Sequence, residues 1–579
     1  MEQLWIWDLE LNFNLLSLNK KNSLMRNLYN FKILFLIIIG IFQISNILAQ
    51  DTLDVAPLND EGEFNLVPTI WGDTVDGGAR KNLNRVYRLQ RGGIYVMDQT
   101  IYANYPIRFV ADNKDKSKRP PILIRGSYST GANIKTFFTF SKDGLAHSFK
   151  GIIFNGVDLD GNYFNEWNRG LKIAGNDISL TIEDCIMNAW AGLFLEVTGD
   201  DASVYIRDSK WRNGVSAQAP PWGAQQNVVF SLHVDTIVMT NNTAFNTGGF
   251  IMDFEKGAVA NYILVEHNTF YTGLIDMLRM RDMSNAKFRS NLYYCTHAYG
   301  QSESERKSNW FDRDQEYLSM FSIDTTDVNL LNSIGLTEAD KNVVVSNNTY
   351  FSPQVLKDWW ASVSGLNTPV WMNGRTKAMF DDDSSYPKLN VFDNNETNPN
   401  FVDTDMDAWI VGEVVEYCKN VRNHSAITDR NYDRHTGLTN LRMLPWPLPE
   451  SLVYTNADML VGGHDGLPVG DLNWYPEKRA LYNENGVNTH DFPGNNQLVS
   501  SFPNPVKDIV EFDFTILSKS NVSLELFNIN GERVMSLINE SLVRGDYKKE
   551  YDLSNLNKGI YFYKLRIGNK SQTQKLIIL

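Results

Sequence analysis

The chain has few cysteines. Its 579 residues contain only Cys185, Cys295 and Cys418, an odd number with wide spacings. Such spacings predict neither a disulfide framework nor a zinc pattern. Cys185 and Cys295 fall inside apolar repeats, so we expect both to be buried as small apolar side chains.

The chain also lacks an excess of positive charge. It carries 54 Lys and Arg against 68 Asp and Glu, which gives a formal net charge of -14. Because affinity for nucleic acid depends on neutralising phosphates, nucleic acid is not an expected partner. An acidic protein also repels polyanions at long range, so an anionic polysaccharide would require a local basic patch or a bound cation.

Long apolar runs are scarce, and the clearest one lies near the start. Arg26 and Lys32 precede an unbroken apolar run over residues 33–42, and Ala49 offers a small residue for cleavage. These features predict that residues 1–50 are an upstream extension and a secretory signal peptide. The run is short for a bilayer, so we expect no stable membrane span in the mature protein; an uncleaved anchor is the alternative.

Six segments repeat one pattern, in which an alternating apolar strand is followed by a polar turn and then a bulky apolar residue. Their central residues are Ile182, Ile206, Met239, Val265, Phe288 and Val345, at intervals of 24, 33, 26, 23 and 57. A period in the mid-twenties with one strand per unit indicates a solenoid, because one unit cannot bury its apolar face alone. The two long intervals then contain insertions.

Four repeats place Asn three residues after the central residue, at Asn242, Asn268, Asn291 and Asn348. We expect these residues to adopt the left-handed conformation of a turn and their amides to stack into a ladder. With this pattern, residues 76–351 resemble the right-handed parallel β-helix proteins of the pectate lyase type. The resemblance implies an all-β fold and does not identify a reaction.

The flanking segments complete a predicted domain order. Residues 51–351 form the β-helix with its N-terminal cap, residues 352–482 a C-terminal cap packed on the last coils, and residues 483–497 a polar linker. Within the C-terminal cap, Asp403, Asp405 and Asp407 have the spacing of a calcium loop. Ala408 and Val414 stand where an EF-hand requires Gly and Glu, so a polar turn is favoured.

Residues 498–579 are predicted to form a small β-sandwich, because short alternating strands are separated by turn signals such as Asn530-Gly531 and Lys558-Gly559. Together with Pro503-Asn504-Pro505, Gly559-Ile560-Tyr561 and the terminal residues 575–578, this segment resembles the C-terminal sorting domain of the type IX secretion system. The resemblance implies the type IX secretion machinery as a partner and a secreted or cell-surface location. A plain immunoglobulin-like attachment domain is the alternative.

Strand alternation identifies side chains on the outside of the coils, since every second residue of a strand points away from the core. We expect these side chains to form one polar band along a sheet, with neighbouring coils about 4.8 Å apart. The band comprises Glu196, His233, Asp253, Glu255, Arg279 and Arg281, with Lys256 at a strand end.

Two reactions fit this band. Elimination from a uronate polymer needs a base and positive charge to stabilise the intermediate. By resemblance to lyases of this fold, Arg279, Arg281 or Lys256 would be the catalytic base or neutraliser, and Asp253 and Glu255 would hold calcium. From their place in the band, His233 is a further catalytic candidate and Glu196 a substrate contact. Alternatively, Asp253 and Glu255, about 6.6 Å apart along a strand, suit an inverting glycoside hydrolase, although the nearby arginines oppose proton donation.

The predicted function is therefore action on an extracellular polysaccharide, with β-elimination as the leading reaction. A non-catalytic carbohydrate-binding or adhesive protein is the alternative, in which Trp211, Trp222 and Trp310 stack on sugar rings. Charged pairs on adjacent strands also form without any function, so a purely structural ladder is a further interpretation of the band.

Overall fold

The computed structural model describes residues 51–75, 78–127, 131, 134–163, 169–190, 192–214, 226–254, 258–280, 282–302, 319–333, 335–423, 431–484, 499–502, 504–516, 520–529, 531–542, 545–567 and 570–579. The predicted signal peptide lies outside these residues. Among the helices within them, none combines the length and the apolar character needed to cross a bilayer.

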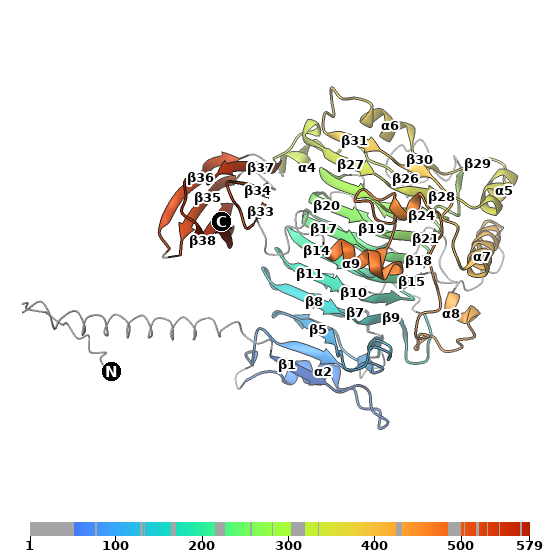
Figure 1. Ribbon diagram of the computed structural model, residues 1–579. Helices are drawn as coiled ribbons and strands as arrows, with labels where there is room; N and C mark the ends of the chain where they lie inside the picture. Colours follow the sequence, from blue (N-terminus) through green and yellow to red (C-terminus); the bar gives the residue numbers. More distant parts are fainter. Residues whose placement is uncertain are drawn as a thin grey trace, which may run out of the picture. The chain divides into compact units, whose positions relative to one another are not determined.

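Three parallel sheets wind around one apolar core, as Figure 1 shows. Sheet 1 consists of β1 (Thr52–Val55), β2 (Val86–Leu89), β5 (Arg108–Ala111), β8 (Ala146–Lys150), β11 (Ser179–Glu183), β14 (Ala202–Arg207), β17 (Val234–Thr240), β20 (Ala260–Glu266), β23 (Asn285–Arg289), β27 (Asn342–Ser346) and β31 (Leu389–Phe392). Sheet 2 consists of β3 (Ile94–Met97), β6 (Ile122–Arg125), β9 (Ile153–Asp158), β12 (Ile186–Asn188), β15 (Lys210–Gly214), β18 (Thr243–Thr247), β21 (Thr269–Gly273), β24 (Leu292–Tyr294), β28 (Thr349–Phe351) and β32 (Asn395–Glu396). Sheet 3 consists of β4 (Ile101–Ala103), β7 (Thr136–Phe140), β10 (Arg169–Ile173), β13 (Leu193–Val197), β16 (Gln226–Phe230), β19 (Phe250–Phe254) and β22 (Leu278–Arg279).

The register of sheet 1 confirms the predicted repeat. Each central residue pairs with the next one, from Ile182 with Ile206 through to Phe288 with Val345, so both long intervals are insertions between coils. The pattern continues further than predicted, because Val345 pairs with Val391 of β31. The expectation that the coils end at residue 351 is therefore wrong by one coil. Its apolar signal is weak because Val391 and Phe392 are exposed.

The asparagine ladder is present, and all four predicted residues are buried. The side-chain oxygens of Asn268, Asn291 and Asn348 each accept hydrogen bonds from the backbone N–H and the amide of the preceding coil's Asn; for Asn291 these donors belong to Asn268, at 3.0 and 2.9 Å. The oxygen of Asn242 accepts from the backbone N–H of Ser209 at 2.9 Å. The predicted left-handed conformation belongs instead to the residue before each Asn, namely Asn241, His267, Ser290 and Asn347. The Asn side chain turns inward, where only another coil can satisfy it.

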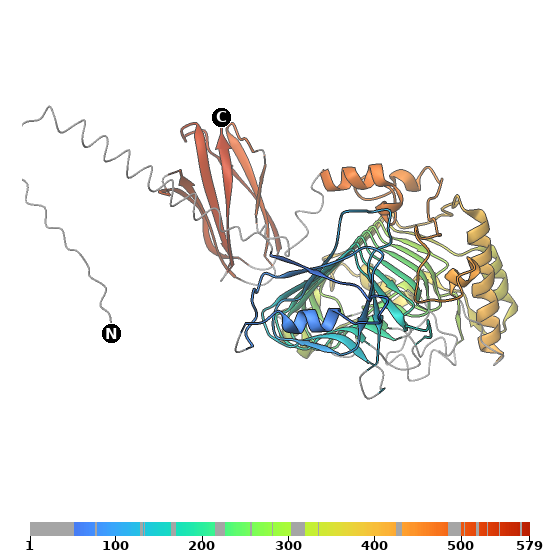
Figure 2. The ribbon, with the colours of Figure 1, turned by 90° about the horizontal axis from the view of Figure 1, so that it is seen from below.

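Helices and short strands connect and cover the coils. They are α2 (Leu66–Gly72), β25 (Gln301–Ser302), β26 (Ser319–Phe321), α4 (Val328–Ser333), η1 (Glu338–Asp340), α5 (Gln354–Ser362), β29 (Leu366–Asn367), β30 (Val370–Met372), α6 (Gly374–Phe380), α7 (Thr404–Arg422), α8 (Tyr432–His435), η2 (Met459–Val461), η3 (Leu472–Trp474) and α9 (Pro476–Glu484). Helix α2 lies across the first coil (Figure 2). It buries Leu66, Val67 and Ile70 in the core. This agrees with the predicted N-terminal cap.

The sequence predicts a cap on the last coils, but the segment after the last coil extends beyond the end of the stack. It returns along the outer face of sheet 2, where α5 and α7 bury Tyr271 and Tyr294. It then reaches back to β9, where the amide of Asn155 donates to the carbonyl of Leu441 at 2.9 Å. Sheet 2 is covered because its outer face is aromatic, a feature that the inward repeat does not encode.

The three aspartates of the calcium-like spacing begin this cover. Asp403 caps α7 by accepting from the backbone N–H of Met406 at 3.0 Å. Asp407 accepts from the hydroxyls of Tyr271 and Tyr294, at 2.8 and 2.7 Å. The favoured interpretation of a polar turn is corrected, because Asp403 is the N-cap of α7 and Asp405 and Asp407 lie in its first turn.

Residues 459–484, here called the strap, run back across the turns between sheets 1 and 2. Its contacts follow the coils in reverse order, from Asn347 with Gly462, through Ser290 with His464, to Asp208 with Arg479. The partners on the coils are the left-handed turn residues. The strap is thus fastened to side chains that the repeat projects at one position per coil.

Asp471 of the strap is a buried acid whose titration is coupled to folding. Its pKa is raised to about 6, because burial outweighs the hydrogen bonds that Thr243 and the backbone N–H of Asn473 donate to it. Protonation of this group therefore contributes stability that is fully present below about pH 4 and lost as pH rises through about 6.

We expect Asp471→Asn to remove this dependence. The free energy of unfolding of the wild type should fall relative to that of the variant by about 2 kcal/mol between about pH 4 and pH 7. Urea denaturation at both pH values measures this difference. Asp458→Asn, at an exposed acid just before the strap, is the control, and parallel curves for wild type and Asp471→Asn would contradict the prediction.

The C-terminal residues fold as a separate antiparallel domain with its own core. One sheet holds β33 (Ser500–Phe502), β34 (Ile509–Ile516) and β37 (Gly545–Asp552), and the other holds β36 (Arg533–Leu542), β35 (Ser520–Asn528), β38 (Gly559–Ile567) and β39 (Lys570–Ile578). The predicted small β-sandwich is confirmed.

Candidate functional site

The outer face of sheet 3 carries a column of side chains in lateral register, all of them polar except Val229. The pairing runs from Tyr102 through Thr139 and Lys172 to Glu196, and then through Val229 and Asp253 to Arg279. We call these seven residues the column. Its members come from seven successive coils, so residues far apart in sequence become neighbours at the strand spacing. The predicted association of Glu196, Asp253 and Arg279 with one sheet is correct.

Glu196 is held by two cations. Its Oε2 lies 2.6 Å from Nε of Arg169 and 2.8 Å from Nζ of Lys172, its neighbour on β10. Burial alone would raise the pKa of Glu196, but the hydrogen bonds and charges of Arg169 and Lys172 outweigh it and hold the pKa below its usual value. Glu196 is therefore an ionised residue near neutral pH and not a proton donor.

Asp253 and Arg279 form the second pair. Arg279 donates to both carboxylate oxygens of Asp253, each at 2.6 Å, and its guanidinium lies 4.3 Å from the ring centre of Phe250. The side chain of Asp253 is 0% exposed, whereas that of Arg279 is 19% exposed. Asp253 is therefore an outer-face residue, as strand alternation predicts, but Arg279 covers it from solvent.

Two other predicted positions are corrected by the structure. His233 does not belong to the column, because it lies in the turn before β17, with Nδ1 2.7 Å from Asp201 and Nε2 3.0 Å from Asn261. Val229 occupies the position between Glu196 and Asp253. Strand alternation predicts that His233 points outward, but β16 ends at Phe230, so the alternation does not extend to His233.

Trp211 is the second correction, since it is 1% exposed and packs in the core. It cannot stack on a sugar ring there. Trp211 and Arg212 are neighbours on the short strand β15, so only one of them can point inward. Arg212 lies on the outer side. Trp222, Trp310, Glu255, Lys256 and Arg281 lie outside the described residues.

Sequence reasoning missed Tyr102, Arg169 and Lys172. Tyr102 is 70% exposed, and Arg169 and Lys172 keep 29% and 31% of their side chains exposed. The alternation of β4 and β10 contains the signal, but their repeats lack the Asn that marks the later coils. The column and Arg169 together contain three cations, Arg169, Lys172 and Arg279, and two carboxylates, Glu196 and Asp253. This face therefore has a local excess of positive charge, although the protein as a whole is acidic.

Chemically, this face offers cationic and hydroxyl donors and one exposed aromatic ring along a line. Such groups suit an extended ligand bearing hydroxyl and carboxylate groups. Both described carboxylates already accept from cations, so neither is arranged as the acid of an acid–base pair.

Comparison with known proteins identifies the C-terminal domain. Residues 500–579 match the family described as the secretion system C-terminal sorting domain. A search of curated proteins finds no match for the chain. The protein is therefore exported through type IX secretion, to the cell surface or the medium, and its sorting domain interacts with that machinery.

Proposed function

We propose that this exported β-helix protein binds an acidic extracellular polysaccharide along the outer face of sheet 3. The observation that carries the proposal is the column, in which partly exposed Lys172 and Arg279 follow the coils in register beyond Tyr102. A linear polymer presents carboxylates and ring faces at regular steps, and a β-helix presents side chains at regular steps too. Export places the protein where such polymers occur.

β-Elimination is the reaction that the charges of this face favour. Elimination requires positive charge beside the substrate carboxylate, and Arg279, steadied by Asp253, supplies a fixed cation there. Hydrolysis needs a protonated acid, which the paired carboxylates do not provide. Binding without catalysis is the alternative outcome of the test below.

Binding is tested with Lys172→Ala on polygalacturonate, alginate and glycosaminoglycan. We expect about five-fold weaker binding, since loss of one partly exposed charge contact costs about 1 kcal/mol. Lys150→Ala is the matched control, because Lys150 pairs with Glu183 across β8 and β11 on sheet 1 at 2.6 Å, just as Lys172 pairs with Glu196 on sheet 3. Equal affinity of both variants would overturn the proposed face.

Catalysis is scored in the same samples by the ultraviolet absorbance of unsaturated products. A signal that Lys172→Ala lowers would support a lyase. Binding without any such signal on the whole panel would identify a non-catalytic binder.

Calcium was predicted at Asp253 and Glu255 by resemblance. Both oxygens of Asp253 accept from Arg279, and its side chain is fully covered. This arrangement does not fit a calcium ligand, so the proposed function includes no calcium-bound step. Calcium dependence stays a prediction, which polysaccharide binding with and without a chelator tests.

A further inference from the structure

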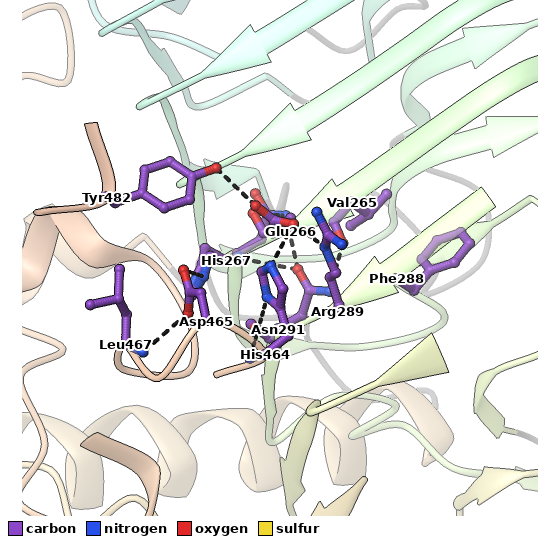
Figure 3. Close-up of polar contacts among 12 residues, drawn as sticks. Val265, Glu266, His267, Phe288, Arg289, Asn291, His464, Asp465, Leu467 and Tyr482 are labelled. Atoms are coloured by element: carbon purple, nitrogen blue, oxygen red, sulfur yellow. Dashed lines mark hydrogen bonds and ion pairs between the residues drawn. The ribbon is translucent and has the colours of Figure 1, made fainter. Parts of the chain in front are cut away.

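Where the strap crosses the turn after β20, it brings together His267, His464 and Asp465 (Figure 3). One ligand atom of each residue lies within 4.8 Å of the other two. The side chain of His267 is 0% exposed, and those of His464 and Asp465 are 16% and 7% exposed. This cluster lies apart from the column of sheet 3 and has no part in the proposed polysaccharide face.

The hydrogen bonds of His267 pose a problem that a cation solves. Its Nδ1 lies 3.1 Å from the carbonyl oxygen of Pro468, and since a carbonyl only accepts, Nδ1 carries the proton. Its Nε2 lies 3.2 Å from Oδ2 of Asp465, which is also an acceptor. A neutral ring would therefore direct a lone pair at a carboxylate. Only a doubly protonated ring or a cation between the two atoms removes this clash.

The second histidine distinguishes these solutions. His464 directly precedes Asp465 in the strap, and its ring centre lies 5.7 Å from that of His267. A neutral imidazole keeps one nitrogen lone pair, which can bind a metal ion. A second imidazole adds nothing to an ion pair between His267 and Asp465, whereas it supplies the third ligand of a metal site.

Neighbouring oxygen atoms also hold the ring of His464 in place, as the residues around metal ligands do. The Nδ1 of His464 lies 2.8 Å from Oγ of Ser290, and its Nε2 lies 3.5 Å from Glu266. Whichever nitrogen faces the ion, the other has an oxygen partner that fixes the ring, as His267 has in Pro468. Glu266 is itself held by Arg289 and by the hydroxyl of Tyr482.

The strap is shaped to present this pair of ligands. A side chain at Gly463 would approach the carbonyl of Leu467 to 2.6 Å and His267 to 3.2 Å, so only glycine lets the loop come this close. Gly466 adopts a φ of +77°, in the left-handed region that favours glycine. Both glycines bring His464 and Asp465 against the coil that carries His267.

We propose that His267, His464 and Asp465 bind a zinc ion that fastens the strap to the solenoid. Two imidazoles and a carboxylate suit Zn²⁺ better than the all-oxygen preference of Ca²⁺ or Mg²⁺. The 3.2 Å between His267 and Asp465 matches the edge of a tetrahedral zinc site, roughly 3.3 Å from its bond lengths. The ligand atoms lie within 4.8 Å of one another, so the third atom moves inward by up to about 1.5 Å to complete the set.

The test uses the full mature chain, stripped with a chelator and titrated with Zn²⁺ alone. We expect one ion per chain and a rise in melting temperature with Zn²⁺, because metal binding to the folded state stabilises it. His464→Gln and Asp465→Asn should each weaken binding by at least about 100-fold. His435→Gln, whose ring stacks on Trp409 at 3.9 Å in the sheet 2 cover, is the matched control and should bind as the wild type does.

Co²⁺ gives a second readout that does not depend on stability. Its visible absorption should show a tetrahedral site in the wild type and in His435→Gln, and lose that form in His464→Gln. Absence of stoichiometric Zn²⁺ binding, or equal binding by His464→Gln and the wild type, would overturn the proposal. Far-UV circular dichroism of each variant shows that its coils are intact.

Discussion

Arg212→Ala is expected to lower the free energy of unfolding by about 3–5 kcal/mol, the cost of removing one partner from a buried ion pair. Arg212 is 0% exposed and lies on the outer side of β15, beneath the cover of sheet 2. It donates to Asp433 at 3.1 and 2.8 Å and to Glu450 at 2.5 and 2.7 Å. Both carboxylates have side chains that are 1% exposed.

The size of this loss in the free energy of unfolding depends on the two carboxylates that remain after Arg212 is removed. Without Arg212, the two buried carboxylates lose the cation that pairs with both of them, so uptake of a proton or detachment of the segment that covers sheet 2 is expected. The expected failure is local, since residues 431–454 can detach while the coils stay wound. Guanidinium denaturation measures the loss, and limited proteolysis shows whether cleavage starts in that segment.

Two controls separate charge from packing. Arg88→Ala breaks the exposed pair with Asp54 on sheet 1 and should have a much smaller effect. Arg212→Met combined with Asp433→Asn and Glu450→Gln removes all three charges and should recover much of the loss. A cost below about 1 kcal/mol for Arg212→Ala would contradict the prediction.

The contrast between Arg212 and the inner repeat explains how far sequence reasoning reaches. The inner residues repeat because every coil meets the same neighbours, so Ile182, Met239 and Val345 predict the register of sheet 1 with its insertions. The partners of Arg212 lie more than 200 residues further along the chain. No periodicity links them, because the cover is not itself a repeat.

The candidate sites show the same division. Strand alternation correctly predicts that Asp253 and Arg279 lie on one sheet, because both belong to coils in register. His233 was misplaced because alternation does not show where a strand turns the corner, and here β16 ends at Phe230. The cluster of His267 and His464 was missed entirely, since it joins a coil to the strap across 197 positions. The side chains of repeats are predictable, whereas contacts between a repeat and a unique segment need coordinates.

Asn291→Ala is expected to cost about 3–5 kcal/mol, because it leaves several buried polar groups without a partner. The oxygen of Asn291 accepts from the backbone N–H and the amide of Asn268, and the amide of Asn291 donates to the carbonyl of Val265 at 2.9 Å. Asn268 and Asn291 are both 0% exposed. Water cannot replace the lost oxygen at this depth, and each unsatisfied buried group costs about 1–3 kcal/mol.

The chain contains its own controls for this effect. Asn394 ends the ladder and is partly exposed, so Asn394→Ala leaves the donors of Asn348 within reach of water and should cost about 1 kcal/mol. At the equivalent position of an earlier coil, the hydroxyl of Ser209 accepts from the backbone N–H of Cys185 at 3.1 Å. Asn291→Ser should therefore recover part of the stability that Asn291→Ala loses.

Urea denaturation of the three variants gives the expected order, with Asn291→Ala least stable, Asn291→Ser intermediate and Asn394→Ala nearest the wild type. Because each coil contacts only its neighbours, the loss should also appear as faster amide hydrogen exchange in the coils of Asn268 and Asn291 before it spreads along the stack. Equal costs at Asn291 and Asn394 would show that burial does not determine the strength of the ladder. In that case the fold would depend on the apolar core alone, and the polar turns would only set its register.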